Sequence, residues 1–243
     1  LSLVVWNNGK HLVPDFGSCG YDSAEKGQWT AHTVSHNTLT VDGQSQYPGL
    51  DTDKTWPCDS FQKRALGKLG FFHADPFLRV AQANCDTLFE GVKLTRTVAL
   101  VDGQIVDFYR VQSRDTHIYD YALHIDAPFQ SASAPLTPLA DPLGKNCGYQ
   151  HIHQAQGAAA TAQQISTTWG GEQSGLTVTS LGGEPTQLIV GQSITTAPGK
   201  LMPMQILRRE ATDTIFGTIL APAQPDSGSA RWVTDATGVS VET

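Results

Sequence analysis

Two residues near the start of the chain, Asp15 and His36, carry side chains that could act together. Asn8-Gly9 predicts a two-residue type I′ hairpin turn, because that turn needs positive φ at both central positions. Antiparallel counting across the turn places Ser2 opposite Asp15, beside the very start of the chain. Pro14 cannot donate to a strand ladder and therefore predicts an edge or a bulge at this point. Taken alone, an aspartate in such a place is usually a turn former.

The segment 30–43 supplies the second side chain. Strand alternation along it places Asn37 on the apolar face and His36 on the opposite face. Asn37 is therefore predicted to be buried, where its amide must find backbone partners. A neutral imidazole and a carboxylate that converge from adjacent strands would suit zinc. Two ligands do not complete a site, and the alternative is a pair of polar surface residues.

Other polar side chains are weaker candidates. His151 and His153 alternate onto one face and could chelate a metal, but no third ligand is evident and an exposed strand end is favoured. His117 and His124 are interpreted as sheet-surface residues. In Arg208-Arg209 the two side chains point in opposite directions along a strand, so at most one of them would meet a carboxylate.

Period-two alternation and Gly-containing turns predict an all-β, antiparallel β-sandwich. Counting across Asn8-Gly9 pairs Trp6 with His11, and Asp102-Gly103 predicts a second tight turn. Short helices are predicted over 60–69 and 155–166, and a long surface loop over 127–148. The predicted strands cover 1–6, 11–16, 37–41, 78–83, 95–101, 104–111, 119–125, 176–180, 186–190, 204–209, 214–220 and 239–242.

Composition bounds the class of protein. A chain of 243 residues can form one sandwich domain over 1–243. A net charge of -7 with only 16 Lys and Arg residues leaves no basic stripe for nucleic acid. No apolar run is long enough to span a bilayer. The 4 cysteines form no Cys-x-x-Cys pair, and free thiols are expected ahead of disulfides. Few Lys with many Gln, Thr, Ser and Gly predict a periplasmic or secreted protein.

Several segments together resemble the heparinase II/III-like polysaccharide lyases, a family that includes oligoalginate lyases. Residues 35–46 are similar to the family's His-Asn-Thr…Val-Asp-Gly…Gln segment, and 1–17 resemble the hairpin that precedes it. Residues 90–98 and 105–110 also match later family strands. The resemblance implies the large β-sandwich that follows an (α/α) toroid in that family. The chain begins within a strand and without Met, so we expect it to be the C-terminal part of a longer lyase.

The resemblance also implies a site. The family's zinc is held by a histidine upstream of the hairpin, by an aspartate at the position of Asp15 and by a histidine at the position of His36. The first histidine falls before Leu1, so the site is incomplete in this chain. Catalytic acid and base groups are expected upstream as well. Tyr21 and Trp29 could stack on sugar, although Trp29 could equally be core, and His32 could be a further substrate contact.

The resulting hypothesis is a β-sandwich that works with its toroid on an anionic polysaccharide or oligosaccharide, by β-elimination at a uronic acid. Alginate-type substrates lead over heparin-type ones. The isolated chain is predicted to be inactive. One alternative is a non-catalytic carbohydrate-binding or structural sandwich. Another is a stand-alone metal-dependent hydrolase or cupin-like enzyme, in which His11 or His32 would supply the third ligand.

Overall fold

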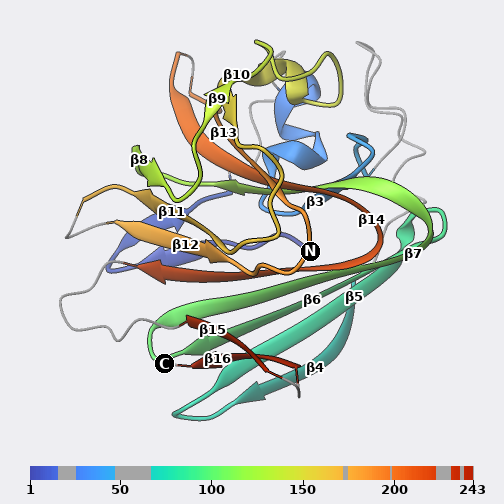
Figure 1. Ribbon diagram of the computed structural model, residues 1–243, viewed down its shortest axis with the longest axis vertical. Helices are drawn as coiled ribbons and strands as arrows, with labels where there is room; N and C mark the ends of the chain where they lie inside the picture. Colours follow the sequence, from blue (N-terminus) through green and yellow to red (C-terminus); the bar gives the residue numbers. More distant parts are fainter. Residues whose placement is uncertain are drawn as a thin grey trace.

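The computed structural model describes residues 1–15, 26–46, 67–171, 175–197, 199–222, 231–235 and 238–242. Within these ranges antiparallel strands dominate, as the sequence predicted (Figure 1). The strands are β1 (Val5–Asn7), β2 (Lys10–Val13), β3 (Leu39–Val41), β4 (Lys68–Ala74), β5 (Arg79–Phe89), β6 (Val92–Val101), β7 (Gln104–His124), β8 (Phe129–Ala132), β9 (Thr137–Pro138), β10 (Ile152–Gly157), β11 (Ile165–Trp169), β12 (Leu176–Ser180), β13 (Gln187–Ile194), β14 (Leu201–Pro222), β15 (Arg231–Asp235) and β16 (Gly238–Glu242). The described residues also form the π-helix η1 (Lys26–Thr30) and the short 3-10 helices η2 (Thr33–Ser35) and η4 (Tyr149–His151).

Two long strands, β7 and β14, pair along almost their whole length and belong to both layers of the sandwich. The first half of β7 and the second half of β14 lie in one layer, between β6 and β12. The second half of β7 and the first half of β14 lie in the other layer, between β3 and β13. Figure 1 shows both strands bending at the right-hand end of the view. The sandwich is therefore one sheet folded over on itself.

The bend coincides with a break in the β7–β14 register. Ala211 pairs with His117, whereas Asp213 pairs with Gln112, so β7 carries extra residues at this point. Irregularities of this kind raise the local twist and bend a strand. The sequence predicted four separate strands here, at 104–111, 119–125, 204–209 and 214–220, and the structure joins them into two.

Side chains from both layers fill the main core, with Tyr109 and Leu94 on one side and Tyr121 and Leu207 on the other. A second apolar cluster covers the outer face of the β7–β14 layer. It contains Trp29, Val34, Ala122, Cys147, Tyr149, Ile152, Ala155, Ile189, Met204 and Ile206. The last part of β7 is consequently buried on both of its faces.

The second cluster overturns one interpretation made from the sequence. His124 was expected on the sheet surface, but it is 0% exposed, because the segment that contains Trp29 packs over this face of β7. The helix predicted over 155–166 is also wrong, since β10 and β11 occupy its two ends and the residues between them, 158–164, are not helical. Of the helix predicted over 60–69, residues 60–66 lie outside the described residues and the rest enters β4. The loop over 127–148 contains the short strands β8 and β9.

Turn chemistry behaves as the sequence predicted. Asn8 and Gly9 have φ of 49° and 78°, and Asp102 and Gly103 have φ of 48° and 74°. Both pairs therefore adopt the left-handed conformation that a type I′ turn needs. Cys85 and Cys147 are both buried, whereas Cys19 and Cys58 lie outside the described residues. None of the described helices is long and apolar enough to cross a membrane.

A buried arginine ties the start of the chain to the sandwich. Arg96, on β6, is 4% exposed and donates to both carboxylate oxygens of Asp107, at 3.0 and 2.7 Å. Its Nη1 donates to the backbone oxygens of Leu1, at 2.6 Å, and Asn37, at 2.7 Å. Tyr121 accepts a further bond from Nη2 at 2.9 Å. Five hydrogen bonds thus replace the hydration of the buried guanidinium.

Arg96→Met should lower the free energy of unfolding by about 3–5 kcal/mol, because it leaves the Asp107 carboxylate buried without its cation. Arg110→Met is the matched control. Arg110 pairs with Asp213 at 3.2 Å on the surface, both side chains being 47% exposed, so its loss should cost less than about 1 kcal/mol. Urea unfolding measures both values. If both variants lost the same free energy of unfolding, the Arg96 network would contribute no more to stability than a surface ion pair.

Candidate metal-binding site

The β1–β2 hairpin brings Asp15 to the start of the chain. Trp6 pairs with His11, as counting across the turn predicted. Beyond that pair a bulge between Val5 and Trp6 shifts the register by one residue, in agreement with the irregularity expected from Pro14. The Ser2 hydroxyl still donates to Oδ2 of Asp15 at 3.1 Å. Asp15 therefore lies beside the first residues of the chain.

His36 meets Asp15 side chain to side chain. Nδ1 of His36 lies 3.0 Å from both Oδ1 and Oδ2 of Asp15. The two side chains are 29% and 25% exposed, so the pair is open to solvent on one side. His36 lies between η2 and β3. The strand expected over 37–41 begins only at Leu39, so His36 is not followed directly by a strand. The structure thus joins the two residues that the sequence singled out.

The surroundings of His36 create an excess of acceptors. Its Nε2 lies 3.1 Å from the carbonyl oxygen of Thr30, while its Nδ1 faces the Asp15 carboxylate. A neutral imidazole carries a single N–H and can satisfy only one of these acceptors. A second proton or a metal cation between Nδ1 and the carboxylate would satisfy both contacts. The arrangement is therefore chemically suited to a cation.

The geometry allows zinc with a small adjustment. Donor atoms that share a tetrahedral zinc at about 2.0–2.2 Å lie roughly 3.3–3.6 Å apart. The separation of 3.0 Å between Nδ1 and each oxygen is a few tenths of an ångström shorter. The described part of the chain contains no cluster of three or more His, Cys, Asp or Glu residues that could hold a metal ion. Asp15 and His36 fit as two ligands of a site that needs at least one more.

A third histidine, His124, lies close to this pair. Burial lowers the pKa of His124 to about 3, the charge of His36 acts in the same direction, and Asp15 opposes it. The Nδ1 atom of His124 lies 3.2 Å from Oδ1 of Asn37. Its ring meets that of Trp29 edge to face, with centroids 5.9 Å apart. The sequence offered no signal that His124 would be buried beside the Asp15–His36 pair. Alternation along β7 cannot reveal that a distant segment covers the outer face of the strand.

The remaining predicted site residues occupy different environments. Trp29 is 0% exposed and His32 is 2% exposed, with its Nδ1 2.8 Å from the hydroxyl of Ser45. This burial favours the alternative that Trp29 belongs to the core. Sugar contact by either residue stays a prediction. Tyr21 lies outside the described residues.

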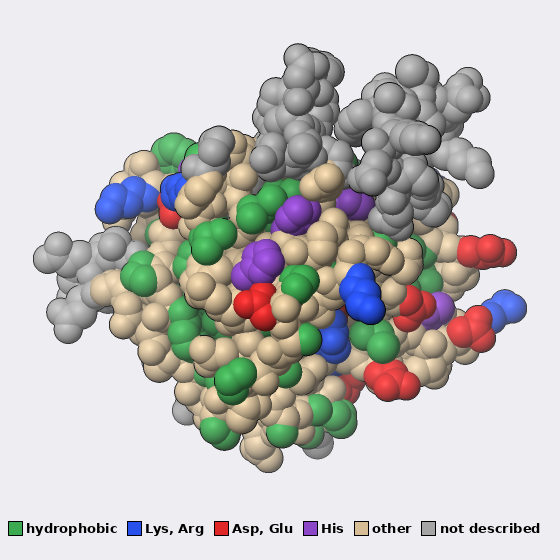
Figure 2. Space-filling view, turned by 90° about the horizontal axis from the view of Figure 1, so that it is seen from above, with side chains coloured by type: hydrophobic (Ala, Val, Ile, Leu, Met, Phe, Trp, Pro, Cys, Tyr) green, Lys and Arg blue, Asp and Glu red, His purple; other side chains and the backbone are tan. Residues whose placement is uncertain are grey.

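Several other histidines form pairs with acids on the surface. His153 meets Asp141, and His117 meets Asp42, each at 2.7 Å. Figure 2 shows histidine and acidic side chains side by side on the upper face. His151 ends η4, a short helix that precedes β10, so the strand alternation expected for His151 and His153 does not hold.

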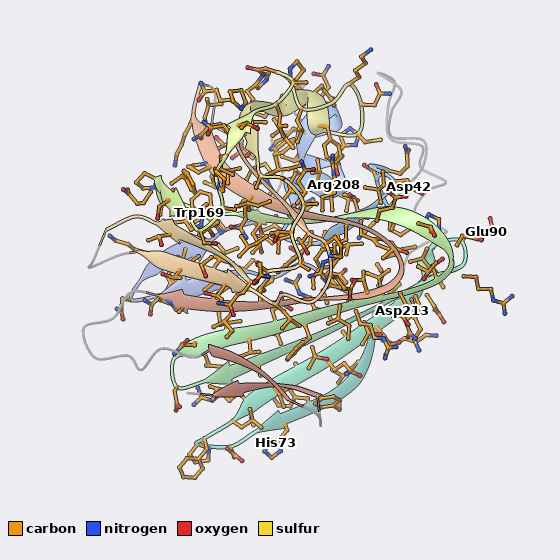
Figure 3. The ribbon with its side chains drawn as sticks, in the orientation of Figure 1. Asp42, His73, Glu90, Trp169, Arg208 and Asp213 are labelled. Carbon is orange, nitrogen blue, oxygen red and sulfur yellow. The ribbon has the colours of Figure 1, made fainter. Side chains whose placement is uncertain are left out.

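The two adjacent arginines do point in opposite directions, but each lies within ion-pair distance of an acid of the same chain. Arg208 donates to both oxygens of Asp120 at 2.7 Å, on the upper layer where Figure 3 labels it. Arg209 is buried on the other face, with Nη1 3.7 Å from Glu184. The expectation that at most one would meet a carboxylate is therefore wrong, since β14 is covered on both faces.

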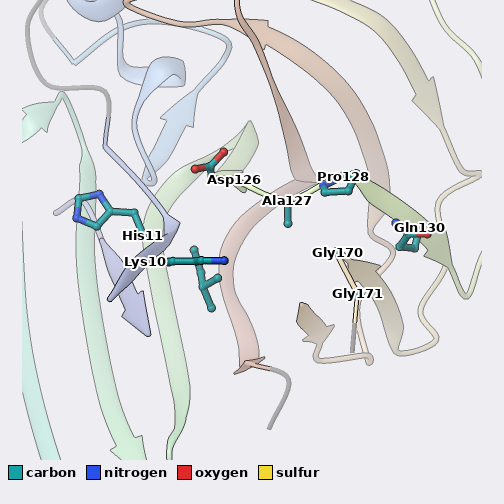
Figure 4. Close-up of a pocket in the computed structure, with 9 residues that line it drawn as sticks. Lys10, His11, Asp126, Ala127, Pro128, Gln130, Gly170 and Gly171 are labelled. Atoms are coloured by element: carbon teal, nitrogen blue, oxygen red, sulfur yellow. The ribbon is translucent and has the colours of Figure 1, made fainter. Parts of the chain in front are cut away.

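A separate hollow of about 440 Å³ lies beside the hairpin (Figure 4). Lys10 extends toward it, whereas the His11 side chain points the other way. Asp126, Gln130 and the 170–171 backbone complete most of the lining. Asp15 and His36 are not among the lining residues, so this hollow and the candidate metal site are distinct.

Comparison with known proteins identifies the class of this domain. The family model for the heparinase II/III-like C-terminal region matches residues 1–233, so the chain belongs to that family. An alginate lyase of Stenotrophomonas maltophilia is 28% identical over 96% of this chain and 33% of its own length. An exo-oligoalginate lyase of Saccharophagus degradans is 24% identical over 70% of this chain and 24% of its own length.

Solved structures agree on the fold. The heparan sulfate lyase HepC from Pedobacter heparinus superposes with a TM-score of 0.64 at 13% identity, over 98% of this chain and 32% of that one. A heparinase III superposes with a TM-score of 0.63 at 14% identity, over 96% of this chain and 31% of that one. The chain thus spans about a third of the length of these lyases. It is a β-sandwich domain of the polysaccharide lyase family.

The depressed pKa of His124 makes stability depend on pH. The unfolded chain takes up a proton at this histidine near pH 6.5, whereas the folded protein does so only near pH 3. Stability should be full above pH 6.5 and fall toward pH 3, with a contribution from His124 of up to about 1.4 kcal/mol per pH unit. In urea unfolding with a chelator present, His124→Gln should show a shallower slope. If the free energy of unfolding changed with pH equally in the wild-type protein and in His124→Gln, the lowered pKa of His124 would be contradicted.

Proposed function

We propose that this chain is the β-sandwich part of a longer lyase that cleaves uronate-containing glycans by β-elimination. The observation that carries the proposal is the Asp15–His36 pair, held at 3.0 Å at the start of a family sandwich. In this proposal Asp15 and His36 bind zinc together with a ligand from outside the chain. The zinc supplies a rigid cross-link in the wall of the sugar cleft.

The reaction explains why the catalytic atoms are expected elsewhere. The C5 proton of a uronic acid is weakly acidic, so an enzyme must neutralise the adjacent carboxylate, remove the proton and protonate the departing O4. Asp15 and His36 already face each other, and Nε2 of His36 is directed to Thr30. They serve as ligands that shape the cleft rather than as acid and base.

Alginate-type glycans are the proposed substrate class. The curated relatives that match over most of this chain are named as an alginate lyase and an exo-oligoalginate lyase. The structural neighbours include a heparan sulfate lyase at 13% identity, and that likeness supports the fold rather than the substrate. Uronate is the chemical feature common to both groups of glycans.

Zinc binding is tested on the full-length protein. Purified wild-type protein should retain zinc after dialysis, and Asp15→Asn or His36→Gln should lose most of it, because each removes one ligand. His153→Gln is the matched control, since it disrupts another His–Asp pair, 2.7 Å apart, at a different place on the chain. Elemental analysis measures the zinc content. Retention of stoichiometric zinc by both site variants would rule out these ligands.

Activity is tested separately. The full-length protein should generate unsaturated uronate, detected by ultraviolet absorbance, faster on alginate than on heparin or chondroitin sulfate. The isolated 243-residue chain should generate none, because the groups that remove and donate protons are expected upstream of Leu1. Product release by the isolated chain would contradict the proposed division of labour.

A further inference from the structure

We propose that Asn37 is the positioning residue that sets Asp15 against His36. The inference rests on the proposed metal-binding function and deepens it, since it names the side chain that pre-organises the site. Asn37 directly follows His36 in the sequence and is 0% exposed. Its amide bonds to the segments that carry or adjoin both metal-facing side chains.

The amide of Asn37 is fully used. Its Nδ2 donates one hydrogen bond to the carbonyl oxygen of Pro14 at 2.7 Å and one to that of Leu3 at 2.9 Å. Its Oδ1 accepts from the backbone N–H of His124 at 2.7 Å, and Nδ1 of the same residue lies 3.2 Å away. An amide has two donor hydrogens and two acceptor lone pairs, and the contacts occupy all four.

Two of the three partners are next in sequence to Asp15 or to a residue that contacts it. Pro14 immediately precedes Asp15, and Leu3 immediately follows Ser2, whose hydroxyl donates to Asp15. The third partner, His124, anchors the amide to the rigid end of β7. The buried side chain of Asn37 therefore fixes the two backbone segments, at Leu3 and Pro14, that lie on either side of the Asp15 carboxylate. Asn37 is also the residue directly after His36.

This cross-link replaces an absent strand ladder. The β1–β2 pairing extends only from Val5 to Asn7 and from Lys10 to Val13, with a bulge at Val5 and Trp6. Pro14 has no N–H with which to continue it. Besides the Arg96 bond to Leu1, the chain start is held by the Leu3 N–H, which donates to the backbone carbonyl oxygen of Asn37 at 3.2 Å, and by the side-chain amide of Asn37. Without the amide, the backbone next to Asp15 loses its buried donor.

The test uses Asn37→Leu in the full-length protein. Leucine has a similar size and no charge, so zinc affinity does not change through an added carboxylate. Gln205→Met is the control. Gln205, on β14, is a buried amide, 1% exposed, and it accepts a hydrogen bond from Thr167 on β11, so it contacts neither Asp15 nor His36 through this bond. Both variants leave a buried polar partner unsatisfied, so both should lower the unfolding midpoint in urea.

Zinc affinity, measured by competition with a chelator, should fall about 10- to 100-fold in Asn37→Leu, as for other residues that orient metal ligands, and less than about twofold in Gln205→Met. The visible spectrum of the cobalt-substituted protein should change only in Asn37→Leu. Asn37→Ser, which places no bulky apolar group among the polar partners and is too short to keep both donor bonds, should weaken zinc binding in the same way and serves if the leucine variant does not fold. Wild-type affinity and spectrum in a folded Asn37 variant would overturn the inference. Absence of zinc from the wild-type protein would instead overturn the proposed function.

Discussion

The guanidinium of Arg96 is the charge around which the start of the chain is arranged. A buried cation is costly unless hydrogen bonds and a counter-charge replace its hydration. Asp107 supplies the charge, and the carbonyl oxygens of Leu1 and Asn37 supply two of the remaining acceptors. The same contacts hold the first residue of the chain against the segment that carries His36. The Asp15–His36 pair therefore depends on an ion pair that lies within the sandwich.

The folded-over sheet explains where the candidate site can form. In its second half β7 is buried on both faces, by the main core on one side and by the Trp29 cluster on the other. The segment from η1 to η2 contains no strand, but its side chains Trp29 and Val34 belong to the second cluster and so pack against the sheet. His124 marks the boundary, since its side chain lies beneath this segment and next to Asn37. A rigid strand end thus supports a site that is built from loops.

The site is consistent with a division of roles between parts of a longer lyase. The family relatives are about three times as long as this chain, and the described residues supply two candidate zinc donors. In the proposed function, Asp15 and His36 complete a cross-link with a ligand from the preceding segment. Such a cross-link would couple the sandwich to the part of the protein in which elimination is proposed to take place.

Local sequence determined the features that depend on neighbouring residues. The Asn8-Gly9 and Asp102-Gly103 turns and the strand at 176–180 followed from backbone preference and alternation. Asn37 is buried as predicted, but alternation is not the reason, because Thr38 and Thr40 on the opposite predicted face are buried as well. Tertiary structure decided the rest. It joined predicted strands into β7 and β14, buried His124 under a distant segment and turned the amide of Asn37 toward Pro14 and Leu3. Alternation reports only which face of a strand a residue occupies, whereas these outcomes depend on what packs against that face.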